Sequence, residues 1–153
     1  MSKQDQYETI ARTLAALLEG ERDWIANLAN TSALLFAELS DVNWAGFYLL
    51  KDGELVLGPF QGKPACVRIA LGKGVCGTAA QRRESIVVPN VHEFPGHIAC
   101  DSASNSELVV PLIRNGKLLG VLDVDSPVLA RFDADDRLGL EEIALILIKQ
   151  TTQ

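Results

Sequence analysis

The sequence contains no cluster of basic residues, and acidic side chains outnumber basic ones. Lys and Arg total 14 against 20 Asp and Glu, so the formal net charge is −6. Because binding a polyanion requires a positive patch, this balance disfavours nucleic acid and an anionic membrane as partners.

There is also no apolar run of about 18 residues that could span a bilayer, and the first residues have no signal-like apolar core. The expected location is the cytoplasm.

Cysteine is scarce, and no two cysteines have the Cys-x-x-Cys spacing. The three cysteines are Cys66, Cys76 and Cys100. A small odd number fits thiol chemistry in a reducing compartment better than a secreted disulfide scaffold. A zinc site that joins His97 and Cys100 to another cysteine is conceivable, but the missing Cys-x-x-Cys pair disfavours it. No metal is therefore expected.

The length and composition predict one globular domain over residues 1–153. The chain is 48% hydrophobic and 22% charged, which is enough apolar material for a core without disulfides. Apolar side chains recur at helical spacing over about residues 5–18 and 23–39, with Asp23 as a plausible N-cap. A closing helix is predicted from the N-cap Asp133 to about residue 148.

Between these helices the apolar pattern changes to the alternation that is typical of strands. The expected strands are 42–50, 55–60, 65–70, 85–88, 107–113 and 117–126, with a short helix at 75–83. Asp-Gly and Asn-Gly turns connect two hairpins. The predicted fold class is α+β, with an antiparallel sheet of about five or six strands and helices packed on one face.

Cys100 lies near the centre of a polar loop of small residues, 97–107, which follows a segment broken by two prolines and a glycine. Long loops in ordered domains are often functional, so Cys100 is a candidate nucleophile; the alternative is a buried thiol that packs as a small hydrophobe. Cys76 is a second candidate, because the N-terminus of the short helix would lower the pKa of its thiol. Composition does not decide between them.

Trp44 and Tyr48 share one face of the first predicted strand, with Gly46 as a gap between the two rings. They form either ordinary half-buried sheet packing or an aromatic wall of a small-molecule pocket. The two interpretations fit the sequence about equally well.

Asp123 and Asp125 project from one face of the last predicted strand, while alternate residues face the core. A two-residue turn before this strand would put Glu107 on the opposite face. A three-residue loop with Gly116 in the left-handed conformation would bring Glu107 across from Asp123. The second register clusters three carboxylates, which is costly unless a cation binds or one acid is protonated.

Several segments resemble the GAF-domain free methionine-(R)-sulfoxide reductases, and the resemblance covers almost the whole chain. They are NWAGFYLL, LVLGPFQGKPACVRIALGKGVCGTAA, IVVPNVHEFPGHIACDSASNSELVVPL, GKLLGVLDVDSP and FDADDRLGLEEI. The resemblance implies a GAF fold, free L-methionine (R)-sulfoxide as substrate, thioredoxin as reductant and no cofactor. Because GAF relatives commonly dimerise, a homodimer is one expected assembly.

The resemblance also implies residue roles. Cys100 matches the catalytic cysteine, Cys66 the usual resolving cysteine and Cys76 a third cysteine of less uniform role. The substrate-contacting carboxylates and the aromatic that packs on the substrate methyl are matched by Glu107, Asp123, Asp125 and Trp44. Tyr48 is expected to line the same pocket.

Two other functions use some of the same residues. A GAF sensory module would bind a small ligand without chemistry, but it does not predict thiols at both Cys66 and Cys100. A redox switch would use the cysteines but leave the three carboxylates without a role.

Overall fold

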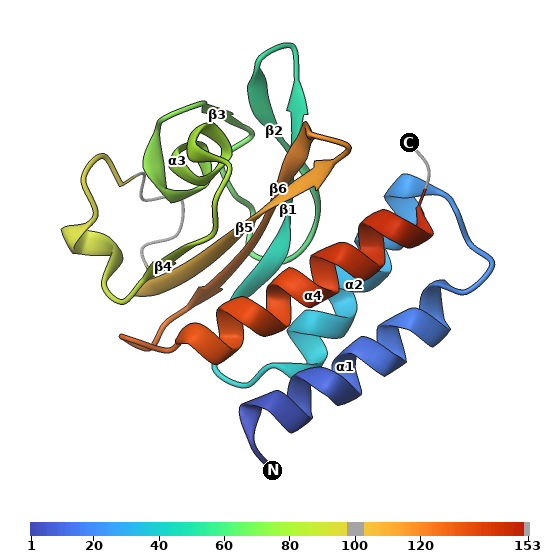
Figure 1. The fold of residues 1–153 in the computed structure, drawn as a ribbon. Coiled ribbons are helices and arrows are strands. Elements are labelled where there is room, and N and C mark those ends of the chain that lie inside the picture. The colour runs from blue at the N-terminus through green and yellow to red at the C-terminus, as the bar shows by residue number, and fades with distance from the viewer. Residues whose placement is uncertain (98–102, 152–153) are drawn as a thin grey trace.

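The structure, a computed structural model, describes residues 1–97 and 103–151. Cys100 lies outside the described residues. The elements, in chain order, are α1 (Lys3–Leu18), α2 (Trp24–Glu38), β1 (Trp44–Lys51), β2 (Glu54–Gly62), β3 (Arg68–Ala70), α3 (Gly74–Arg82), β4 (Ile86–Val88), the 3-10 turn η1 (Val91–Glu93), β5 (Ser106–Arg114), β6 (Lys117–Ser126) and α4 (Ala134–Gln150) (Figure 1).

Within the described residues, six strands form one antiparallel sheet in the order β3-β2-β1-β6-β5-β4. The three longer helices, α1, α2 and α4, cover one face, and α3 lies on the other (Figure 1). The predicted α+β class and strand number are confirmed. The expectation that helices pack on one face holds for α1, α2 and α4. The short helix α3 instead packs on the opposite face, where its apolar side chains form a second, smaller core with the sheet.

The helices begin where the sequence provides side-chain caps. The Ser2 hydroxyl accepts a hydrogen bond from the backbone of α1, and the Asp23 carboxylate does the same for α2. Asp133 and Asp136 form a reciprocal capping box at the start of α4. Such caps satisfy amide groups that have no partner inside the helix, which fixes the starting residue. Among the described residues, no helix is long and apolar enough to cross a membrane.

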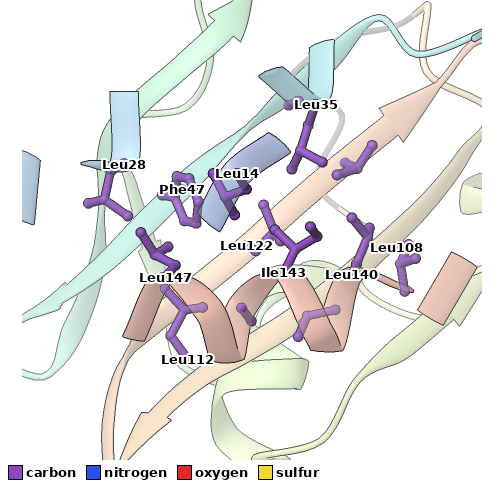
Figure 2. Close-up of a cluster of buried hydrophobic side chains, with 14 of the residues drawn as sticks. Leu14, Leu28, Leu35, Phe47, Leu108, Leu112, Leu122, Leu140, Ile143 and Leu147 are labelled. Carbon is purple, nitrogen blue, oxygen red and sulfur yellow. The ribbon is translucent and has the colours of Figure 1, made fainter. Parts of the chain in front are cut away.

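The larger hydrophobic core lies between the sheet and the three longer helices (Figure 2). Phe47 on β1 and Leu122 on β6 pack there against Ile143 and Leu147 of α4, and all four side chains are fully buried. Because side chains alternate along a strand, the neighbours Trp44 and Tyr48 point to the opposite face, where α3 lies.

A buried carboxylate ties α1 to the start of α4. Asp136 is 1% exposed and accepts a hydrogen bond from the Tyr7 hydroxyl at 2.8 Å. It also pairs with Lys3 at 2.7 Å and with Arg131 at 3.3 Å. Two cations and a hydroxyl therefore compensate this buried charge, which joins segments that are far apart in the sequence.

The register of the β5–β6 hairpin combines features of both predicted alternatives. The turn has two residues, with Arg114 paired to Lys117, but the register shifts by one residue between Leu112 and Ile113. This β-bulge returns Glu107 to the face that carries the two aspartates, and its direct partner is Asp125. Each predicted register was therefore right in one feature only, the first in its turn and the second in the face of Glu107. Neither included the bulge, because a bulge inside a strand leaves little trace in the hydrophobic pattern.

Candidate active site

One pocket lies between α3 and the face of the sheet that this helix covers. It collects most of the residues predicted for the site. The lining includes Trp44, Tyr48, Cys76, Glu107, Asp123 and Asp125, together with Pro64, Ala65, Ile69, Lys73, Gly74, Val75, His97 and Ser104. The pocket therefore joins aromatic rings, carboxyl groups and a thiol from four separate elements, β1, α3, β5 and β6.

Trp44 and Tyr48 line the aromatic side of the pocket, and Phe60 extends their stack. The centroid of Trp44 lies 5.9 Å from that of Tyr48 and 5.1 Å from that of Phe60, with interplanar angles of 21° and 14°. Phe60 was not predicted. The sequence signal for it is Gly46, because a Cβ atom there would lie 2.2 Å from the Cβ of Phe60. The gap between the first two rings thus makes room for a third ring on β2.

The polar atoms of the aromatic wall hold the loop that carries Cys66. The indole nitrogen of Trp44 donates to the carbonyl of Lys63 at 3.1 Å, and the Tyr48 hydroxyl donates to the carbonyl of Cys66 at 2.9 Å. Burial, and then the nearby charge of Asp123, raise the pKa of Tyr48, so its hydroxyl remains a donor. Tyr48 therefore presents its ring to the pocket while its oxygen fixes the backbone of Cys66.

Glu107 and Asp123 place two buried carboxyl groups beside this wall, on the same face of the sheet. They are 8% and 5% exposed. Asp125 lies on the same face, because β5 pairs Glu107 with Asp125 and Val109 with Asp123. One oxygen of Asp123, Oδ1, is buried and has no hydrogen-bond partner among the residues that the structure describes.

Burial is the main cause of the high pKa of both carboxyl groups. Desolvation raises the pKa of Glu107 well above its usual range, and the charge of Asp123 raises it further. Desolvation likewise raises the pKa of Asp123, and the charge of Asp125 adds to this. Like charges in a low dielectric favour the protonated forms. The cluster can therefore hold a proton, which is one of the two conditions predicted for three clustered carboxyl groups, the other being cation binding.

Cys76 is a buried free thiol inside the same cluster. Its Sγ lies 3.8 Å from Oε2 of Glu107. Burial, and then the charges of Asp123 and Glu107, raise the pKa of this thiol well above its usual range. The predicted lowering by the helix N-terminus is wrong here, because desolvation and neighbouring acids outweigh the helix dipole. Cys76 is a proton donor in this state rather than a thiolate.

The other two cysteines differ from Cys76. Cys66 takes part in a disulfide, and Cys100 lies outside the described residues. His97 lines the pocket, and its ring centroid lies 6.2 Å from that of His92. Partial burial, and then His92, lower the pKa of His97, which favours the neutral imidazole.

The fold and the position of the pocket define a GAF domain, and a GAF domain family model matches residues 4–148. The chain is 54% identical to the free methionine-R-sulfoxide reductase of Escherichia coli over 149 residues, which cover 97% of this chain and 90% of that protein. It is 45% identical to the free methionine-R-sulfoxide reductase of Saccharomyces cerevisiae, and the match covers 97% of this chain and 87% of that protein.

A solved structure gives the same result. The X-ray structure of free methionine-R-sulfoxide reductase from Neisseria meningitidis in complex with its substrate matches with a TM-score of 0.94 and 47% sequence identity, covering 98% of this chain and 90% of that one. The chain therefore belongs to the GAF-domain free methionine-R-sulfoxide reductase family.

Proposed function

We propose that this protein reduces free L-methionine (R)-sulfoxide to L-methionine, with Cys100 as nucleophile, Cys66 as resolving cysteine and thioredoxin as reductant. The observation that carries the proposal is the pocket that brings an aromatic wall and buried carboxyl groups together beside the Cys66 loop. Two relatives, 54% and 45% identical to this chain, carry the name of this activity. The homodimer stays a prediction.

In the first step, the Cys100 thiolate attacks the sulfoxide sulfur. The sulfoxide oxygen takes up a proton and moves to the cysteine sulfur, and methionine leaves. The substrate sulfur gains two electrons and Cys100 loses two as it becomes a sulfenic acid. A carboxyl group with a raised pKa, Glu107 or Asp123, is suited to supply the proton at neutral pH.

In the second step, the Cys66 thiol attacks the sulfenic sulfur, water leaves and a disulfide forms. Two features support Cys66 over Cys76 in this role. Cys66 takes part in a disulfide while Cys76 remains a thiol. The raised pKa of Cys76 also disfavours the thiolate that an exchange reaction needs. A dithiol reductant of the thioredoxin class would then restore both cysteines.

The remaining groups account for the preference for a free amino acid. A carboxylate of the cluster that stays ionised can pair with the ammonium group of free methionine sulfoxide, which a methionine inside a polypeptide lacks. The aromatic wall formed by Trp44 and Tyr48 can pack on the methyl group of the substrate. The unpartnered Oδ1 of Asp123 is an acceptor for such a donor.

Methionine release from free methionine-(R)-sulfoxide, with a thioredoxin recycling system, tests the proposal. The intact protein should turn over, Cys100→Ser should be inactive and the (S) epimer should be inert. Cys66→Ser is the matched cysteine control. It should release about one methionine per protein in a single burst and then stop, because the first step precedes disulfide formation.

Two results would contradict the proposal. If Cys100→Ser turns over as the intact protein does, the nucleophile is wrong. If the intact protein binds the sulfoxide but never releases methionine, the chain is a ligand-binding GAF module.

A further inference from the structure

Three potential metal ligands meet at the base of the pocket. Each of Cys76, Glu107 and Asp123 offers one ligand atom, and these three atoms lie within 4.8 Å of one another. All three residues are buried. The ligand atoms around a tetrahedral zinc ion lie about 3.6 Å apart, as its bond lengths require. The distance of 3.8 Å between Cys76 Sγ and Glu107 Oε2 already fits this spacing.

The orphan oxygen of Asp123 is an independent sign that the cluster can take a ligand. Asp123 is 5% exposed, and its Oδ1 has no hydrogen-bond partner among the described residues. A buried carboxylate oxygen without a donor costs free energy, which a cation placed beside it would recover. Ser104 and Lys73 also line the pocket, but neither is a hydrogen-bond partner of this oxygen.

We propose that Cys76, Glu107 and Asp123 form a binding site for a thiophilic divalent cation of the zinc and cadmium class, and that the bound cation excludes the sulfoxide substrate. One thiolate and two carboxylates suit Zn²⁺ or Cd²⁺ better than Mg²⁺ or Ca²⁺, which prefer oxygen ligands alone. The cation replaces the thiol proton and the carboxyl protons, which pass to the buffer.

The exclusion of substrate follows from shared groups. The proposed function assigns Glu107 and Asp123 to the substrate, and this part of the inference rests on that function. A cation that occupies both carboxylates leaves neither for the ammonium group or for proton transfer. The cation would therefore act as a reversible inhibitor, and its affinity should rise with pH because its ligands must lose protons.

The oxidised protein provides the test without any turnover. When Cys66 is in its disulfide, Cys76 is the free thiol among the described residues. Titration with CdCl₂ after removal of metals should produce the ultraviolet charge-transfer band of a cadmium thiolate at one equivalent. Cys76→Ser should abolish the band, and Asp123→Asn should weaken cadmium binding at least tenfold. MgCl₂ in excess should not displace the cadmium, whereas methionine sulfoxide should.

Each arm has an outcome that overturns the inference. Absence of the band in the intact oxidised protein overturns the site, as does an equal band in Cys76→Ser. If Cys76→Ser does not fold, unchanged cadmium affinity in both Asp123→Asn and Glu107→Gln overturns the carboxylate ligands. Failure of the sulfoxide to displace cadmium overturns the exclusion of substrate. The cadmium band and its loss in the variants use neither sulfoxide nor methionine release, so these results are distinct from a failure of the proposed reaction.

Discussion

Asp123→Asn should make the protein more stable at neutral pH and less active. In the folded state the pKa of Asp123 is raised by burial and by Asp125, whereas in the unfolded chain it returns to about 3.9. As the pH rises above that value, the unfolded state releases a proton that the folded state retains. The free energy of unfolding therefore falls with rising pH, and the asparagine variant escapes this loss.

The size of the gain follows from the burial of the cluster. At a pH above both values, each unit by which folding raises the pKa of Asp123 corresponds to about 1.4 kcal/mol of lost stability, and burial together with Asp125 raises this pKa well above its usual range. In a chain of this length 1 kcal/mol corresponds to about 2 to 4 °C in melting temperature. We expect Asp123→Asn to raise the melting temperature by several degrees at pH 7, and the gain should shrink toward the ordinary pKa of an aspartate.

Chemical and thermal unfolding across the pH range would measure this effect, with methionine release assayed on the same samples. Glu142→Gln, at an exposed position on α4, is the surface control for loss of one negative charge and should change the melting temperature little. The activity of Asp123→Asn should fall about tenfold or more, as for the loss of one charge-assisted contact. A variant less stable than the intact protein at pH 7, or a gain independent of pH, would refute the reasoning.

Three further substitutions test other parts of the structure. Tyr48→Phe removes the hydrogen bond to the carbonyl of Cys66. It should therefore slow disulfide formation more than the first release of methionine, and both rates can be measured by stopped flow. Equal slowing of the two steps would argue against a positioning role for Tyr48. Gly46→Ala would place a Cβ 2.2 Å from that of Phe60, so we expect about 1 to 3 kcal/mol of destabilisation and a higher KM; an unchanged melting temperature would contradict this. Asp136→Ala leaves two cations without their buried partner and should cost about 3 to 5 kcal/mol by denaturant unfolding, whereas a loss below 1 kcal/mol would show that the network is not stabilising.

Much of the fold could be predicted from local sequence alone. The helix that begins after Asp133 was predicted from its cap and its first-turn acids, and the structure has the full capping box. The strand 117–126 was predicted with its correct bounds. Its alternation also placed Asp123 and Asp125 on one face, because the two-residue period of a strand is a property of the backbone.

The composition of the site depended on contacts between distant segments. Phe60 stacks on Trp44 because β2 pairs with β1, and the only local sign of this contact is the missing side chain at Gly46. The face on which Glu107 lies depends on the bulge in the β5–β6 hairpin. A shift of one residue moves every later side chain to the other face of the sheet, so the register depended on a bulge that neither predicted alternative contained.

Cys76 shows most clearly the difference between what the sequence determines and what the tertiary structure decides. The sequence determined that this thiol lies in the first turn of a short helix, and the local dipole argument predicted a lowered pKa. The tertiary structure decided the opposite, because the helix packs onto the sheet and encloses the thiol with Glu107 and Asp123. Local periodicity fixes where a side chain points, whereas desolvation and the charges of distant residues fix its chemistry, and these exist only once the chain has folded.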